Sequence, residues 1–117
     1  MARSNEPLFW SLFSAGGVVA AFFGPVGILL IGLAGPNGWF GADEAFAHER
    51  LRRLVSPAPV RVILFLLVAL PMFHWAHRFR FTLADLGLRG RDKRLAFVCY
   101  GTAVAVTLIG AVVLARL

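Results

Sequence analysis

Apolar and polar positions alternate along this chain in long blocks, with three apolar stretches separated by short polar connections. The clearest stretch is Ala58–Phe81, whose middle, Val62–Trp75, has His74 as its only polar side chain. With its flanks it reaches the roughly 20 residues that a helix needs to cross a hydrocarbon core. A buried core helix would show the same run, but the chain lacks polar, amphipathic partner segments to cover one. The pattern therefore predicts a transmembrane helix over about residues 58–80.

The two other stretches predict helices of the same kind. Residues 8–33 contain no charged side chain, and this run is longer than the apolar part of a secretory signal peptide. We therefore expect a helix over about residues 8–34 rather than a segment cleaved near Ala20. The last stretch predicts a third span over about residues 95–115. The expected fold class is all-α, a single integral membrane domain of residues 1–117 with three transmembrane helices.

Small residues and prolines indicate how these spans pack. Gly16, Ala20 and Gly24 recur at every fourth position, a spacing that lets helix backbones approach closely. A similar line along the third span consists of Ala103, Thr107, Ala111 and Ala115. We expect both faces to need partner helices. Pro25 and Pro71 lack a backbone N–H, so we expect a bend or a loosened turn in the first and second spans.

The connections are polar and short. Between the first two spans, Pro36–Gly38 predicts a turn. Asp43–Val55 (DEAFAHERLRRLV) predicts a short amphipathic surface helix with Asp43 as its N-cap. Residues 82–94 form the second connection, and no soluble domain is left over.

Composition and charge support a membrane protein. Hydrophobic residues make up 59% of the 117 residues, against the usual 45–50% for soluble domains. The net charge of +6 could indicate nucleic-acid binding, but the basic residues cluster at the ends of the apolar runs. That distribution is typical of membrane topology signals. The single cysteine, Cys99, has no partner for an internal disulfide and is expected to pack as a small apolar residue.

The basic residues also predict an orientation. Seven of them fall on the side of the N-terminus and of the second connection: Arg3, Arg78, Arg80, Arg89, Arg91, Lys93 and Arg94. Five fall on the other side: Arg50, Arg52, Arg53, Arg61 and Arg116. Because the side richer in Lys and Arg faces the cytoplasm, we expect a cytoplasmic N-terminus.

One group of residues could form a binding site for a lipid-soluble quinone. Topology places Trp10, Phe13 and Ser14, at helical spacing in the first span, at the same depth as His77 and Arg78 in the second. A quinone needs an apolar or aromatic wall and a donor for each carbonyl oxygen. The indole N–H and the guanidinium are such donors, and the histidine could relay protons. The alternatives are an interfacial tryptophan anchor, a snorkelling arginine, or a haem ligand at His74 or His77.

Several sequence blocks, in the same order along the chain, resemble the D subunit of bacterial fumarate reductase, which is a membrane anchor. The most specific is Ser4–Gly17 (SNEPLFWSLFSAGG). The others are HER at 48–50, RVILFLLVALP from Arg61, HR at 77–78 and DLGL at 85–88. The resemblance covers nearly the whole chain.

This resemblance implies a place in a larger complex. It implies a heterotetramer in the bacterial inner membrane, with a flavoprotein, an iron–sulfur subunit and a second membrane anchor, the C subunit, against which this chain would pack. Menaquinol would supply electrons for fumarate reduction in anaerobic respiration. Flavin and iron–sulfur clusters would lie only in the partners, with no haem, no metal and no catalytic residue in this chain.

By the same resemblance, Trp10, Phe13 and Arg78 would contact the quinone, His77 would lie beside it, and Ser14 would stand where relatives can have glycine. Arg80-Phe81 replaces a more histidine-rich continuation found in some relatives, which weakens a proton-relay role there. Two rivals stay open: the anchor of a succinate:quinone oxidoreductase, including a haem-binding one, and a purely structural membrane subunit.

Overall fold

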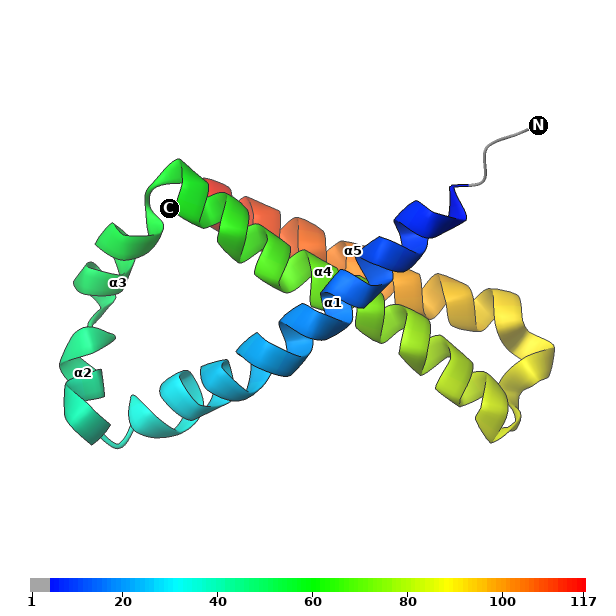
Figure 1. The fold of residues 1–117 in the computed structure, drawn as a ribbon, viewed down its shortest axis with the longest axis horizontal. Coiled ribbons are helices and arrows are strands. Elements are labelled where there is room, and N and C mark those ends of the chain that lie inside the picture. Colours follow the sequence, from blue (N-terminus) through cyan, green and yellow to red (C-terminus); the bar gives the residue numbers. More distant parts are fainter. Residues whose placement is uncertain (1–4) are drawn as a thin grey trace.

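The computed structural model describes residues 5–117, and every regular element in this range is a helix (Figure 1). The elements are α1 (Glu6–Gly27), η1 (Ile28–Ala34), η2 (Trp39–Gly41), α2 (Ala42–Ala45), α3 (His48–Val55), α4 (Ala58–Leu83), η3 (Ala84–Leu88), η4 (Arg89–Arg91) and α5 (Asp92–Ala115). η1 and η3 are π-helical, and η2 and η4 are 3₁₀ turns. The predicted all-α class is confirmed.

Within residues 5–117, two continuous helical stretches are long and apolar enough to cross a membrane, Glu6–Ala34 and Ala58–Ala115. Only 6% and 11% of their most apolar windows are buried inside the chain. Core helices of a soluble protein would be mostly buried. Large side chains such as Phe22 and Phe97 are instead 71% and 81% exposed. This surface requires lipid or partner helices to cover it.

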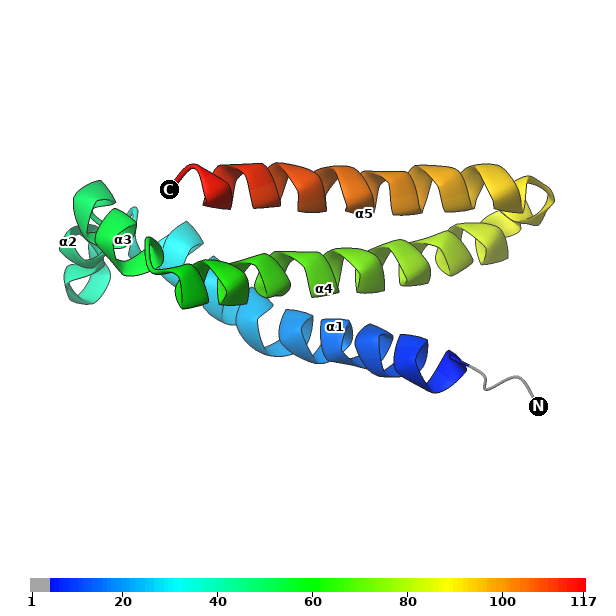
Figure 2. The same cartoon turned by 90° about the horizontal axis from the view of Figure 1, so that it is seen from above.

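The second stretch folds back on itself as a hairpin. A straight helix of its 58 residues would be roughly 87 Å long, but the longest extent of the protein is 53 Å. Figure 2 shows α4 and α5 side by side, with the reversal at η3 and η4. Within this reversal Gly87 has φ 104°, a conformation that glycine adopts without the clash that a Cβ would cause.

The hairpin closes around small side chains. Ala76 of α4 and Cys99 and Ala103 of α5 form its buried centre, so the prediction for Cys99 is confirmed. Met72, Leu83 and Tyr100 pack around them. The predicted small-residue face of the third span therefore packs, at Ala103, inside this chain against α4. The sequence had assigned that face to partner helices.

α1 crosses α4 at two glycines (Figure 1). A Cβ on Gly16 would overlap the carbonyl oxygen of Leu70, and one on Gly17 would lie 2.6 Å from Cε1 of His74. Beyond the crossing the two helices separate. Around Gly24 no atom would lie within 4 Å of an added Cβ, and Ala20 is exposed. The predicted small-residue face of the first span thus has an occupied part and an open part.

Pro25 and Pro71 both lie inside helices, and the backbone differs around the two. α4 runs through Pro71 without a break in its helical assignment. α1 runs through Pro25 and passes at Ile28 into the wider π-helical η1, which ends with a hydrogen bond of 2.8 Å from Gly35 N–H to the Leu30 carbonyl. A loosened turn therefore follows Pro25, as the sequence predicted for the first span.

The prediction of one helix over residues 43–55 is wrong. The chain forms two short helices, α2 and α3, because Ala47 between them is extended (φ −52°, ψ 134°). Asp43 lies inside α2 and is not an N-cap; the residue before this helix is Gly41, with φ 72°. The predicted turn is present, with Gly38 at φ 63° donating its N–H to the Gly35 carbonyl.

Candidate functional site

A pocket of about 530 Å³ opens between α1, α4 and α5 on the side of the crossing nearest the start of α1. Aromatic rings make up most of its wall. It is lined by Phe9, Trp10, Leu12, Phe13, Leu70, Phe73, His77 and Tyr100. The volume and the apolar wall with a few polar atoms are typical of a site for a small organic ligand.

Phe13 connects the wall formed by α1 to α4. Its ring stacks on His74 at a centroid distance of 4.3 Å and meets the edges of Trp10 and His77 at 5.7 and 4.9 Å. Its carbonyl oxygen lies 2.8 Å from Nδ1 of His74. A carbonyl only accepts, so His74 donates from Nδ1. This hydrogen bond lies beside Gly17 and fixes the position of α1 at the pocket. His74 therefore links α4 to α1.

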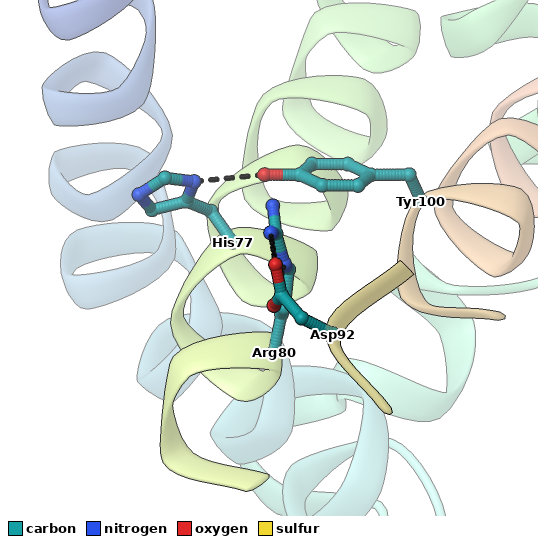
Figure 3. A network of polar contacts seen from close by, with 4 residues as sticks. All are labelled: His77, Arg80, Asp92 and Tyr100. Carbon is teal, nitrogen blue, oxygen red and sulfur yellow. Dashed lines mark hydrogen bonds and ion pairs between the residues drawn. The ribbon is translucent and has the colours of Figure 1, made fainter. Parts of the chain in front are cut away.

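His77 connects the pocket to α5. Its Nδ1 lies 2.8 Å from the hydroxyl of Tyr100 (Figure 3). Its ring also meets the edge of Phe81 at 4.9 Å. Both His77 and Tyr100 are half-buried and line the pocket. Among the described residues that line the pocket, Trp10, His77 and Tyr100 carry the polar side-chain atoms.

Below this pair an ion pair joins the end of α4 to the start of α5. Nε and Nη2 of Arg80 donate to the two carboxylate oxygens of Asp92 at 3.1 and 2.6 Å. Arg80 also lies over the ring of Phe81, 5.4 Å from its centroid. Asp92 belongs to the polar connection outside the apolar spans, and the hydrogen bonds from Arg80 hold the pKa of its carboxyl below the ordinary value.

The structure brings three of the five predicted site residues together. Trp10, Phe13 and His77 share the pocket wall. Ser14 and Arg78 are exposed and are not among the lining residues. Successive residues of an α-helix are turned by about 100°, so a helix that directs His77 into the pocket turns Arg78 toward its outer face.

Sequence reasoning missed Tyr100, together with the apolar wall residues Phe9, Leu12, Leu70 and Phe73. One signal was available for Tyr100, because it is the chain's single tyrosine and lies in an apolar span. Its partner His77 is 23 positions away, however, and only the register of the hairpin brings the two side chains together.

A family model for the D subunit of fumarate reductase matches residues 1–115 of this chain. The chain belongs to the fumarate reductase D subunit family. The D subunits of Mycobacterium tuberculosis (strain ATCC 25618 / H37Rv) and Mycobacterium bovis (strain ATCC BAA-935 / AF2122/97) are each 49% identical over 104 residues, 87% of this chain and 80% of the relative. The D subunit of Vibrio cholerae serotype O1 (strain M66-2) is 33% identical over 114 residues, 94% of this chain and 83% of the relative.

The resemblance stated from the sequence is thus confirmed at the level of the family. Membership of this family implies a fumarate reductase complex with other subunits. The exposed apolar helices agree with a membrane-anchor family.

Proposed function

We propose that this chain is a membrane anchor subunit of a quinol:fumarate reductase, and that the pocket between α1, α4 and α5 is its part of a menaquinol-binding site. Its partners are the flavoprotein, the iron–sulfur subunit and the second anchor, the C subunit, in a heterotetramer of anaerobic respiration. Flavin and iron–sulfur clusters belong to the partners. The observation that carries the proposal is an aromatic pocket with polar atoms in a helix bundle whose outer surface is apolar.

In this proposal the chain crosses the membrane three times. α4 and α5 have 26 and 24 residues, so each is roughly 36–39 Å long, enough for a hydrocarbon core of about 30 Å. α1 with η1 is a further crossing. The reversal at η3 and η4 carries Arg89, Arg91 and, just beyond, Lys93 and Arg94. Because the side richer in Lys and Arg tends to face the cytoplasm, the proposed orientation has the reversal and the N-terminus on the cytoplasmic side.

A labelling experiment tests this orientation. In a Cys99→Ala background, Arg91→Cys should resist a membrane-impermeant thiol reagent added to intact cells, because the reversal faces the cytoplasm. Asn37→Cys, in the turn at the opposite ends of the helices, should react. The opposite labelling pattern would contradict the cytoplasmic N-terminus.

The pocket fits the chemistry of a quinol in three respects. Trp10 and Phe13 supply flat apolar surfaces for a ring, and the indole N–H and the outward nitrogen of His77 supply polar contacts for ring oxygens. The pocket lies at the polar end of the hairpin, near Arg80 and Asp92, so it is close to water on the proposed cytoplasmic side. Bound menaquinol would supply two electrons for the iron–sulfur subunit, and the wall residues would hold its ring.

Ser14 and Arg78 complete the proposed site at its rim. Both are exposed in the isolated chain, next to wall residues of the same helices. In the complex they would face the iron–sulfur subunit or the second anchor. There the Arg78 guanidinium can hydrogen-bond a quinol oxygen that His77 does not contact.

Replacing Trp10 by Ala tests the site in the assembled four-subunit complex. The loss of the indole removes both wall area and an N–H, so menaquinol oxidation should fall by roughly tenfold or more. Fumarate reduction by a water-soluble artificial donor should be unchanged because it bypasses the pocket. Trp39→Ala is the matched control, since this tryptophan lies in η2 at the other end. Menaquinol oxidation at the wild-type rate by an assembled Trp10→Ala complex would contradict the proposal.

The purified four-subunit complex also tests the alternative function, in which the complex carries haem. A reduced-minus-oxidised optical spectrum of the purified complex shows a haem band in that case. His74 is a poor candidate ligand, because Phe13 stacks on its ring and Gly17 packs against its edge.

A further inference from the structure

Two imidazoles of α4, His74 and His77, lie three positions apart and bond to different kinds of partner. The partner of His74 is the Phe13 carbonyl, which can only accept, so Nδ1 of His74 carries a proton. The partner of His77 is the Tyr100 hydroxyl, which can donate or accept. The tautomer of His77 therefore depends on which way this hydroxyl is turned.

The acid–base chemistry of the two groups decides the direction of this hydrogen bond. A phenol O–H is a stronger donor than an imidazole N–H, and an imidazole nitrogen is a stronger acceptor than a phenol oxygen. The preferred bond over the 2.8 Å between Nδ1 of His77 and the Tyr100 oxygen therefore runs from the Tyr100 O–H to the His77 nitrogen (Figure 3).

We propose that Tyr100 is a positioning residue whose hydroxyl donates to Nδ1 of His77, so that neutral His77 carries its proton on Nε2 and presents an N–H donor to the pocket. The other ring nitrogen of His77 points away from Tyr100 toward α1, where Phe13 and Trp10 form the opposite wall (Figure 3). The ligand class that this donor recognises is a planar ring with a carbonyl or hydroxyl oxygen. Its identity as menaquinol rests on the proposed function.

The consequence is that two neighbouring histidines hold opposite tautomers for different purposes. His74 uses its N–H inside the protein to hold α1 on α4. Nδ1 of His77 accepts a hydrogen bond from the Tyr100 hydroxyl of α5, and its Nε2–H points outward to the ligand.

The first test reads the tautomer directly in the complete complex. With ¹⁵N-labelled histidine, His77 should show a protonated Nε2 and an unprotonated, hydrogen-bonded Nδ1; His77→Gln identifies the signals by their loss. Tyr100→Phe removes the donor, so the Nδ1 signal should shift and the second tautomer should appear. Thr102→Val is the matched control, because this hydroxyl of α5 donates to the Val98 carbonyl of its own helix. Unchanged His77 signals in Tyr100→Phe would overturn the inference.

The second test uses activity, with a short-chain menaquinol analogue as the probe. Tyr100→Phe should lower its oxidation roughly 3- to 10-fold, the effect of one lost hydrogen bond. A glutamine at position 77 carries an N–H that does not depend on Tyr100. Adding Tyr100→Phe to His77→Gln should therefore cause no further fall, and an equal fall in both backgrounds would overturn the inference. If the wild-type complex does not oxidise the analogue, the proposed function fails while the ¹⁵N result stands by itself.

Discussion

The two helix contacts of this chain differ in geometry and in chemistry. α4 and α5 run side by side and close around the small side chains of Ala76, Cys99 and Ala103 (Figure 2). α1 instead crosses α4 at Gly16 and Gly17 and separates from it on both sides (Figure 1). Helices that run side by side leave no room for a ligand. A crossing leaves wedge-shaped spaces, and here one of them is the pocket.

Both contacts carry polar groups, in different positions. The hairpin centre is apolar, and its hydrogen bond between His77 and Tyr100 lies beside that centre, whereas the crossing itself carries the His74 bond to the Phe13 carbonyl. In an apolar environment a polar group needs a partner, so hydrogen bonds placed at a crossing fix its position more strictly than apolar contact would. The hairpin thus provides a rigid support, and the position of α1 determines the shape of the site.

The largest effect expected from this comparison comes from placing the same extra methyl group at each contact. Gly16→Ala puts a Cβ against the Leu70 carbonyl, so α1 must shift, at a cost of roughly 1–3 kcal/mol. Gly110→Ala faces α4 from the hairpin side with Val68 Cγ1 3.8 Å away, an ordinary contact, and should be neutral. Thermal unfolding of the purified complex and menaquinol oxidation measure both.

Gly24→Ala is the control on α1 itself, because no atom lies within 4 Å of its added Cβ in this chain. Loss of stability in Gly24→Ala alone would show that a partner helix packs on the open part of that face. Equal effects of Gly16→Ala and Gly110→Ala would contradict the distinction between the two contacts.

The comparison also shows which features could be predicted from the sequence. The long apolar helices, the turn at Gly38 and the buried Cys99 follow from local patterns of apolar and small residues, and these were predicted. The small-residue lines predicted contact faces but not their partners. Ala103 packs inside the chain, whereas Ala20 stays open, and an i+4 spacing is the same in both cases. The break at Ala47 has no signal in the apolar pattern, so the single helix over residues 43–55 was wrong.

Part of the candidate site could be predicted because the order of the spans fixes the depth of each residue in the membrane. Trp10, Phe13 and His77 were placed at one depth from topology alone, and the structure puts all three in the pocket wall. Depth does not determine rotation about the helix axis. Arg78 follows His77 directly in sequence but is exposed, and Tyr100 was not identified because its contact with His77 depends on the register between α4 and α5.

The last prediction concerns Arg78 and tests whether the site extends from the pocket wall to the exposed residues at its rim. If Arg78 hydrogen-bonds a quinol oxygen in the complex, its planar, forked guanidinium cannot be replaced by an ammonium. Arg78→Lys should then lower menaquinol oxidation roughly 10-fold, the low end for a charged hydrogen bond. Fumarate reduction by a water-soluble donor should stay unchanged. A snorkelling arginine would accept lysine, because both charges reach water.

Arg89→Lys is the matched control for Arg78→Lys, since Arg89 lies at the same end of the hairpin, is exposed, and pairs with Asp85 one turn away. It should have no effect on either reaction. Wild-type menaquinol oxidation in Arg78→Lys, together with a loss in Trp10→Ala, would confine the site to the pocket wall. In that case the contact to the second quinol oxygen would have to come from Ser14 at the rim or from a partner protein.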